Sequence, residues 1–271
     1  MKDTKDKTII ITGATDGIGK VTALKFAQQN AHVVIHGRNN KKVTDVVKEL
    51  IDETGNKKME GLVADLSSLQ EVRNLADEIL KKYPLIDIFI NNAGVGYPDT
   101  GISSDGYELR IAVNYLAPFL LTQLILPAIK NAAPSRIINV SSVGQAPVNF
   151  GDFIPKEKGD HVLTYRESKL ALIMFTIDLA EQLKNYSVTV NSLHPGTYLD
   201  TNMVRNANIT PLADAASGAD AEIFLATSPS LNNVTGKYFN VTIETKPHPQ
   251  AYDTQMRKQL WDYSVKLTNL K

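Results

Sequence analysis

The chain alternates short apolar runs with helix-length amphipathic segments, and this alternation limits its possible folds more than any other feature. Strands are expected at KTIIIT, HVVIHG, MEGLVAD, IDIFINN, RIINVSS, SVTVNSLH and KYFNVT. Helices are expected at about residues 18–29, 41–53, 69–82, 105–131, 165–183 and 250–268. Strands that are apolar throughout and alternate with helices form a parallel sheet with helices on both faces. The sequence therefore predicts a doubly wound α/β fold with seven parallel strands.

Composition excludes several classes of protein. The 271 residues are enough for one sizeable core, so we expect a single domain over residues 1–271. No cysteine is present and none of the five histidines lies in an H-E-x-x-H motif, so we expect no bound metal. Basic and acidic residues number 29 each, which gives no electrostatic footprint for nucleic acid. The N-terminal MKDTKDK leads into a strand rather than into the apolar core of a signal peptide. These observations favour a cytoplasmic protein with no membrane anchor and no nucleic-acid partner.

The segment TGATDGIGK, residues 12–20, joins the first expected strand to the first expected helix. In a doubly wound fold this turn presents free backbone N–H groups at a helix N-terminus, where phosphate binds. Gly13 can allow the tight exit from the strand, Gly17 a close approach of the backbone to a pyrophosphate, and Gly19 close packing of the helix on the sheet. We therefore expect a nucleotide ligand and a fold of the Rossmann type.

Two other nucleotide motifs do not fit this segment. A P-loop would need glycine at Ala14 and serine or threonine at Val21. The fingerprint G-x-G-x-x-G fits Gly17 and Gly19 but fails at Thr22. The spacing that is present is T-G-x-x-x-G-x-G, which is also compatible with a tight turn that binds nothing. Other residues must decide between these two interpretations.

Four further segments point to a ligand site at the same edge of the sheet. FINNAG, residues 89–94, ends the fourth expected strand, and Asn114 lies in the helix after it. NVSS ends the fifth strand at Ser142, and Tyr165 and Lys169 form a YxxxK motif in the next helix. Ten tyrosines predict about one YxxxK motif by chance, so the order and placement of the motifs carry the specificity.

In this order the motifs resemble those of the short-chain dehydrogenase/reductase family, from about residue 7 to residue 241. The long segment between Ser142 and Tyr165, the sequence SKLALIMFTIDLAEQL and the ending TGKYFN resemble the retinol-dehydrogenase-like branch. The resemblance implies an NAD(P)-dependent oxidoreductase, such as a carbonyl reductase, that interconverts an alcohol and a carbonyl compound. A nucleotide-binding regulatory protein without turnover is the alternative.

Tyr165 and Lys169 lie one helical turn apart and so share a face, where the ammonium favours the phenolate. Lowering a tyrosine pKa from about 10 by about three units requires roughly 4 kcal/mol of preferential stabilisation of the anion. Tyr165 is then the general base for alcohol oxidation and the general acid for carbonyl reduction. The resemblance implies that Ser142 hydrogen-bonds the substrate oxygen and that Asn114 joins a proton relay through Lys169. The alternative without catalysis is that Tyr165 and Lys169 form an ordinary exposed pair on a helix and that Ser142 is a helix cap.

The choice between NADP and NAD depends on Arg38, which follows HVVIHG where an acidic residue would bind the ribose of NAD. Arginine can bind a 2′-phosphate with two hydrogen bonds, and Lys41 and Lys42 add positive charge, so NADP is favoured while NAD stays possible. Asp16 beside the phosphate turn counts against this preference. The resemblance implies further cofactor contacts at Thr15, Asp16, Ile18, Asp65, Leu66, Asn91, Ala93, Gly94, Pro195, Gly196 and Thr197.

Two irregular segments, residues 143–164 and 197–213, are expected to close over the substrate. They and the NNAG loop bring apolar side chains to the site, so the expected substrate is a small apolar alcohol or carbonyl compound. Packing of these side chains onto the core is the alternative for each of them. The oligomeric state stays open, and a homo-oligomer is possible. The residues concerned are Val95, Tyr97, Val143, Tyr198, Leu199 and Met203.

Overall fold

The computed structural model describes residues 3–96, 101–151 and 160–270, which include one twisted sheet in the order β3-β2-β1-β4-β5-β6-β7-β8. Neighbouring strands from β3 to β7 pair in parallel, and β8 pairs antiparallel with β7. The predicted doubly wound Rossmann-type fold is confirmed. The expected number of seven strands is one too low, because the chain turns back after β7 and adds the short β8. The strands are β1 Thr8–Ile11, β2 His32–Gly37, β3 Met59–Val63, β4 Ile88–Asn91, β5 Ser135–Val140, β6 Val188–His194, β7 Tyr238–Asn240 and β8 Ile243–Glu244.

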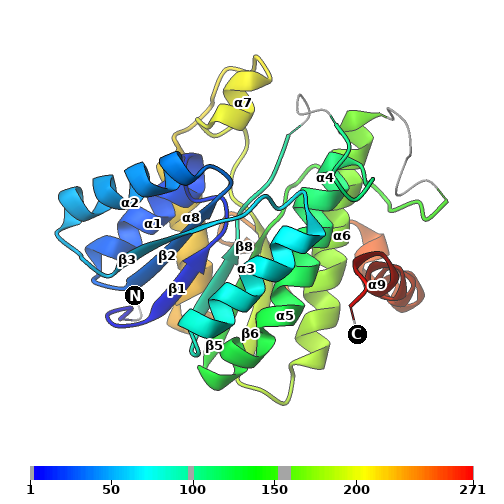
Figure 1. Cartoon of the computed structure of the whole chain (residues 1–271). Helices are drawn as coiled ribbons and strands as arrows, with labels where there is room; N and C mark the ends of the chain where they lie inside the picture. The colour runs from blue at the N-terminus through cyan, green and yellow to red at the C-terminus, as the bar shows by residue number, and fades with distance from the viewer. Residues whose placement is uncertain (1–2, 97–100, 152–159, 271) are drawn as a thin grey trace.

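Helices cover both faces of this sheet (Figure 1). On one face lie α1 Gly17–Gln28, α2 Asn40–Thr54 and α8 Ala215–Thr227; on the other lie α3 Leu69–Lys82, α5 Ala117–Asn131 and α6 His161–Gln182. The strand order reverses between β1 and β4. In a sheet of this kind ligands bind beyond the carboxyl ends of the strands at such a reversal. The loops after β1, β4, β5 and β6 therefore meet at one place.

The central strands are apolar throughout because both of their faces are buried. In β1 the side chain of Ile10 belongs to the core under α3, α5 and α6, whereas Ile9 and Ile11 belong to the core under α1, α2 and α8. Successive side chains of a strand point to opposite faces, so one run of isoleucines contributes to both cores. The β1 strand is thereby fixed in position, and with it the turn that follows.

Helix α6 begins earlier than the sequence suggested. Asp160 caps it by accepting hydrogen bonds from the N–H groups of Val162 and Leu163, so Tyr165 lies in the second turn rather than at the first residue. The helix expected at 105–131 starts at Leu109 and contains a π-helical segment, Ala112–Leu116, before α5. The π segment is where Asn114 lies.

The stretch Leu109–Asn131 is long and apolar enough to cross a bilayer, and no other helix among the described residues has both properties. Its most apolar window is 83% buried inside the protein, against the sheet and its neighbours. A core helix has the same composition as a membrane span, so composition alone does not distinguish them.

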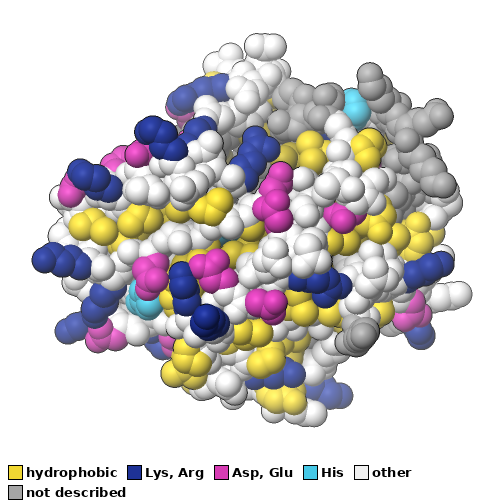
Figure 2. Space-filling model, in the orientation of Figure 1, with side chains coloured by type: hydrophobic (Ala, Val, Ile, Leu, Met, Phe, Trp, Pro, Cys, Tyr) yellow, Lys and Arg dark blue, Asp and Glu magenta, His cyan; other side chains and the backbone are white. Residues whose placement is uncertain are grey.

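Charged side chains of both signs are intermingled on the face of the molecule that Figure 2 shows.

Helix α8 packs against α1 and buries an acidic side chain between them. Glu222 is fully buried and accepts a hydrogen bond of 2.7 Å from Thr22 Oγ1. Its other carboxylate oxygen, Oε1, has no hydrogen-bond partner among the described atoms. Burial raises the pKa of Glu222 to about 8, because removal from water penalises the charged form. At neutral pH this carboxyl group is mostly protonated.

The C-terminal helix α9, Thr254–Thr268, covers the outer side of α5 and α6. Trp261 packs against Phe119 and Phe175, with ring centroids 5.1 and 6.0 Å apart. Arg257, nearly fully buried, donates to the Asp178 carboxylate at 2.6 Å. Burial raises the pKa of Asp178, and the arginine opposes that rise. Aromatic packing and this ion pair together hold α9 in place.

Candidate active site

The turn after β1 needs glycine at the positions that the motif predicts. Gly13 has φ +65°, and a Cβ there would lie 2.6 Å from the Cα of Ala93. A Cβ on Gly19 would lie 2.3 Å from Nδ2 of Asn92 and 2.8 Å from the carbonyl oxygen of Gly13. Such distances are far inside van der Waals contact, and a positive φ is costly for other residues. Gly13 and Gly19 therefore allow the turn to press directly on the end of β4.

The same turn begins α1 and leaves N–H groups at its N-terminus. Gly17 has φ +53°, and Asp16 caps the helix by accepting a hydrogen bond of 2.7 Å from the Gly17 N–H. Thr15 packs on Gly37, where a Cβ would lie 2.5 Å from the threonine methyl group. The half-buried Ile18 side chain packs against Gly218 of α8. Thr15 and Ile18 thus fix the start of α1 against β2 and α8.

Two polar residues that the sequence analysis did not assign hold this turn against β4. Thr12 Oγ1 accepts hydrogen bonds of 3.1 Å from the N–H groups of Asn92 and Ala93. Asn92 Nδ2 donates to the carbonyl oxygens of Thr12 and Gly13 at 2.8 and 2.9 Å. Both residues stand inside the quoted motifs, so the signal was present although their role was not. They join the first and fourth strand ends into one rigid unit.

The side chain of Asn91 faces the other way. Its Nδ2 donates to Thr122 Oγ1 and to Asn139 Oδ1 at 3.0 and 2.8 Å, deep under α5. Adjacent strand residues point to opposite faces, so Asn91 and Asn92 separate in this manner. Any cofactor contact at Asn91 is left to its backbone.

Lys169 carries a buried ammonium group at the centre of the strand ends. It is 4% exposed, and its Nζ donates a hydrogen bond of 3.0 Å to the carbonyl oxygen of Val140 at the end of β5. Burial lowers the pKa of Lys169 to about 8, since desolvation penalises its charge. The Nζ lies 5.6 Å from the centroid of the Tyr165 ring. The structure thus brings Lys169 and Tyr165 together as predicted.

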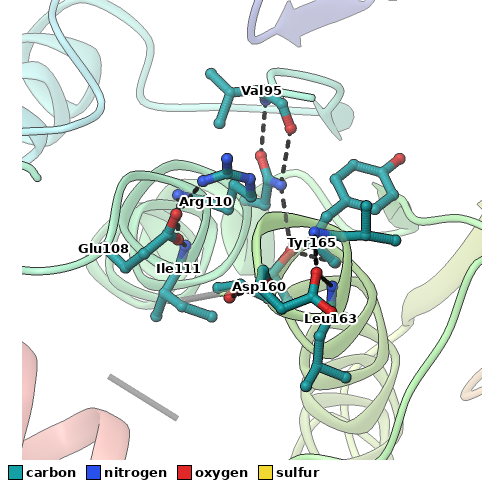
Figure 3. Close-up of polar contacts among 11 residues, drawn as sticks. Val95, Glu108, Arg110, Ile111, Asp160, Leu163 and Tyr165 are labelled. Atoms are coloured by element: carbon teal, nitrogen blue, oxygen red, sulfur yellow. Dashed lines mark hydrogen bonds and ion pairs between the residues drawn. The ribbon is translucent and has the colours of Figure 1, made fainter. Parts of the chain in front are cut away.

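The half-buried Tyr165 side chain extends from α6 away from the capping residue Asp160 and from Leu163 (Figure 3). Its own carbonyl oxygen accepts a hydrogen bond of 2.7 Å from Ser168 Oγ. Ser168 in turn accepts from Nδ2 of Asn114 at 3.2 Å. The π segment and the second turn of α6 are therefore linked by side chains.

Asn114 is held rigidly beside the lysine. Its Oδ1 accepts from the N–H of Val95 at 2.8 Å and its Nδ2 donates to the Val95 carbonyl oxygen at 3.1 Å; the two bonds are visible at the Val95 backbone in Figure 3. A Cβ built on Gly94 would lie 3.3 Å from Asn114 Oδ1 and 3.5 Å from Lys169 Nζ. Gly94 therefore lets the NNAG loop approach both side chains closely. In the same figure Glu108 caps the helical turn Leu109–Ile111, directly before the π segment that contains Asn114. Glu108 also forms an ion pair with the buried Arg110.

The two serines that follow β5, Ser141 and Ser142, have different environments. Ser141 Oγ donates to the Lys169 carbonyl oxygen at 2.7 Å and so faces α6. Ser142 Oγ accepts a hydrogen bond of 3.0 Å from the Gly144 N–H. An oxygen that accepts from a backbone N–H keeps its own hydrogen for another acceptor. Ser142, rather than Ser141, therefore has a donor to offer a substrate.

The adenine and ribose side of the crevice is less specific. Arg38 is exposed after β2, and among the described residues no carboxylate pairs with it. Lys41 forms an ion pair of 2.6 Å with Asp45, which offsets the positive charge it was expected to add. Asp65 accepts the Ser67 N–H at 2.9 Å within its own loop, and Leu66 is buried.

The segment after β6 bends at Gly196, which has φ +142° and follows the buried Pro195. Thr197 Oγ1 lies 3.1 Å from His194 Nε2. Burial and the positive charge of Lys169 together lower the pKa of His194 to about 4. His194 is therefore a neutral residue that supports the bend.

Residues 197–213 form a small lid that contains the short helix α7, Asn202–Asn206. Its Met203 reaches to 3.9 Å from a Cβ built on Gly94, and Thr201 to 3.1 Å from one on Gly17. Asn202 donates a hydrogen bond to the carboxylate of Asp16. The lid thus lies along the crevice from the phosphate turn to the lysine.

Only some of the side chains expected to border the substrate do so. Leu199 is buried at the base of the lid, where a Cβ on Gly218 would lie 2.5 Å from its Cδ1, so it packs the lid onto α8. Val143 and Tyr198 are 49% and 44% exposed. Tyr97 lies outside the described residues.

Comparisons with known proteins agree with this geometry. A profile of the short chain dehydrogenase family matches residues 7–211. Retinol dehydrogenase 13 of Mus musculus is 36% identical over 97% of this chain and 84% of its own length, and retinol dehydrogenase 14 of Homo sapiens is 35% identical over 97% and 87%.

Solved structures show the same fold. A crystal structure of an uncharacterized protein from Mycobacterium paratuberculosis superposes with a TM-score of 0.82, at 27% identity over 99% of this chain and 96% of that chain. A short chain dehydrogenase from Shigella flexneri, complexed with NADP, gives a TM-score of 0.69 at 26% identity, over 89% and 99%. The chain therefore belongs to the short-chain dehydrogenase/reductase family of oxidoreductases, in the branch that resembles the retinol dehydrogenases.

Proposed function

We propose that this oxidoreductase interconverts a small apolar alcohol and its carbonyl compound, with Tyr165 as the general acid and base. The observation that carries the proposal is the buried Lys169 ammonium 5.6 Å from the Tyr165 ring, beside the strand ends. A positive charge in a site of low dielectric favours the phenolate over the phenol. The protein thereby prepares one phenol to exchange a proton with an alcohol.

The residues present fit a nicotinamide dinucleotide. The turn has N–H groups at the start of α1, and a Cβ on Gly13 or Gly19 would collide with the end of β4. These features leave backbone rather than side chains at the place where a diphosphate would bind. When bound, the nicotinamide group supplies or accepts the hydride. Complexes of structural relatives with NADP and with NADPH support this cofactor class.

Four side chains have distinct parts in the proposed reaction. Tyr165 takes the hydroxyl proton in oxidation and returns it in reduction, while Lys169 stabilises its anion. Ser142 donates its hydroxyl hydrogen to the substrate oxygen. Asn114, fixed by Val95 and Ser168, maintains the polar environment next to the lysine through which a proton can be replaced.

The pKa of Lys169 near 8 suits this relay. The group is mostly protonated at pH 7, yet the free energy of losing its proton there is only about 1.4 kcal/mol. It can therefore both stabilise a phenolate and pass on a proton. In this proposal Lys169 supplies both the positive charge that stabilises the Tyr165 phenolate and the group through which a proton passes.

We further propose a preference for NADP over NAD. Its support is Arg38, exposed after β2 without a carboxylate partner in the described chain. The Lys41 and Asp45 ion pair and the nearby Asp16 reduce the positive field that would favour a 2′-phosphate. We expect Arg38→Asp to weaken NADPH binding about tenfold or more and NADH binding much less, measured by fluorescence titration. Equal losses for the two cofactors would contradict this preference.

An apolar substrate is supported by the side chains at the crevice. Val143, which follows Ser142, and Tyr198, at the start of the lid, are exposed apolar side chains, and Met203 reaches toward Gly94. A pocket with few polar anchors selects compounds by shape and apolar area. A panel of aldehydes and ketones with increasing chain length tests this, and the ratio kcat/KM is expected to rise with apolar surface.

The decisive experiment for the reaction is Tyr165→Phe. We expect NADPH to bind within about threefold of the wild type, while turnover falls by about 10³-fold or more because the general acid is lost. Cofactor binding is measured by fluorescence and turnover by the absorbance of the reduced nicotinamide. A variant with a near-normal rate would contradict the role of Tyr165. Cofactor binding by the wild type without turnover on a broad panel would favour the silent regulatory protein instead.

A further inference from the structure

His36, near the end of β2, lies between two loops of the crevice without belonging to either. It is 3% exposed, and its Nε2 lies 3.0 Å from the carbonyl oxygen of Ala64, directly before Asp65 and Leu66. Its Nδ1 accepts a hydrogen bond of 3.4 Å from the N–H of Gly13 in the phosphate turn. One imidazole therefore contacts both the loop after β3 and the turn after β1.

Only one form of the imidazole satisfies both contacts. A carbonyl oxygen can only accept, so Nε2 must carry the hydrogen that faces Ala64. Nδ1 then has a free lone pair for the Gly13 N–H. A doubly protonated ring would turn an N–H toward another N–H at Gly13. Burial lowers the pKa of His36 to about 4, which keeps the ring neutral at physiological pH.

The backbone repeats the connection made by the side chain. The N–H of Ala14 donates to the carbonyl oxygen of His36 at 2.9 Å, and the N–H of Ala64 donates to that of Gly37 at 3.2 Å. Gly13 itself has φ +65° and presses on Ala93. The turn therefore has little freedom on its β4 side, and His36 holds it on the β2 side.

We propose that His36 is a positioning residue of the cofactor site, which sets the phosphate turn relative to the loop that carries Asp65 and Leu66. The inference rests on the proposed function, since these two segments are the ones expected to contact the diphosphate and the adenine. A dinucleotide spans both, so a fixed spacing between them lowers the ordering cost of binding. His36 touches neither substrate nor reacting atoms and should affect binding without affecting the chemical step.

The test compares His36→Phe with His36→Asn and with a matched control. Phenylalanine keeps the ring volume but removes both hydrogen bonds and leaves the Gly13 N–H without an acceptor. Asparagine restores an acceptor near the position of Nδ1. His32→Phe is the control, because His32 lies at the opposite end of the same strand and pairs with Glu60 on the surface.

We expect His36→Phe to raise the Kd of both NADPH and NADH about tenfold to a hundredfold, with kcat at saturating cofactor unchanged. His36→Asn should recover much of this loss, and His32→Phe should show none. The Kd is measured by calorimetry and kcat from the absorbance of the reduced nicotinamide. A normal Kd in His36→Phe, or a fall in kcat equal to the change in Kd, would overturn the proposal.

A second measurement needs no cofactor. ¹⁵N NMR of the wild type without ligand should show the imidazole of His36 as the neutral Nε2–H tautomer, with a hydrogen-bonded Gly13 amide. The opposite tautomer would overturn the proposal even if the variants fold poorly. If the wild type binds neither NADPH nor NADH, the proposed function fails and takes this role with it. If the wild type binds the cofactor, the Kd of the His36 variants tests the role of His36 separately from the proposed function.

Discussion

The phosphate turn, residues 12–19, and the lid, residues 197–213, touch at Asp16 and Gly17 but are held by different means. The turn is fixed by backbone geometry: its glycines press on β4, and Thr12 and Asn92 join the two strand ends. The lid is held at its base by the buried Leu199 and along its length by contacts such as that of Asn202 with Asp16. Most of its side chains are exposed or half-buried.

This difference matches what each region has to recognise. A turn built from backbone binds a diphosphate, which is common to all nicotinamide dinucleotides. A lid held by few buried contacts can open at low cost and can carry different side chains over one scaffold. Both regions rest on α8, which supports α1 through Glu222 and the lid through Gly218. Substitutions that act on one region and not the other test this division.

The largest effect on cofactor binding is expected at the turn, from Gly19→Ala. The added Cβ would lie 2.3 Å from Asn92 Nδ2 and 2.8 Å from backbone oxygen, so the turn must move away from β4. We expect the Kd of NADPH, measured by fluorescence, to rise more than about a hundredfold, which is roughly 3 kcal/mol. Gly151→Ala is the control, since the nearest contact of a Cβ there is 3.4 Å. A normal Kd in Gly19→Ala would break the claim that backbone geometry governs this region.

The second effect is on stability rather than on cofactor binding, depends on pH, and is expected beneath the turn, from Glu222→Gln. The pKa of Glu222 in the folded protein, about 8, lies above its ordinary value, so the folded state keeps a proton that the unfolded chain releases. The free energy of unfolding should therefore fall as pH rises from about 4.5 to about 8, by at most about 1.4 kcal/mol per pH unit. The glutamine variant should lose this slope, matching the wild type at pH 5 and exceeding it at pH 8.

Urea unfolding at several pH values measures this slope. The control is Glu78→Gln, which changes an exposed carboxylate that pairs with Lys82 on α3. A wild type whose stability does not fall between pH 5 and pH 8 relative to Glu222→Gln would show that the buried carboxyl is neutralised in some other way.

The smallest effect is expected at the lid, from Leu199→Ala. Loss of a buried leucine costs about 2 to 5 kcal/mol in a rigid core, but here part of that cost is avoided because the lid can open. We expect hydrogen exchange of the lid amides to accelerate about tenfold or more, and the Kd of NADPH to change about threefold or less. Unchanged exchange in the lid, or faster exchange in the turn, would contradict independent behaviour of the two regions.

Sequence patterns predict local features of this molecule well. The helix at residues 69–82 has the expected bounds, because Ser68 caps its start and its buried positions recur with helical spacing. The motif residues Tyr165, Lys169 and Asn114 come together because they lie in the helices that follow β4 and β5. The alternation of strands and helices in the sequence already places these two strands next to each other in chain order.

Features that depend on tertiary contacts could not be predicted in this way. For Leu199 the sequence left open a place at the substrate or packing onto the core; it packs on Gly218 of α8, and no local pattern connects the two residues. The NNAG motif does not say which asparagine faces the turn, since that depends on the register of β4 in the sheet. The strand β8 has only two residues, too few to show a period.

Helix α9 has a consequence for the synthesis of the chain. The faces that it covers, at Phe119 and Phe175, belong to helices complete by Gln182, whereas Trp261 is translated roughly 80 residues later. At translation rates of about 5 to 20 residues per second, this delay is about 4 to 16 s. During that interval Phe119 and Phe175 lack the cover that Trp261 gives them in the folded protein, and we expect chaperones or other unfinished chains to bind there. The arrival of α9 covers these two rings, so we expect the growing chain to aggregate most readily before Trp261 has been made.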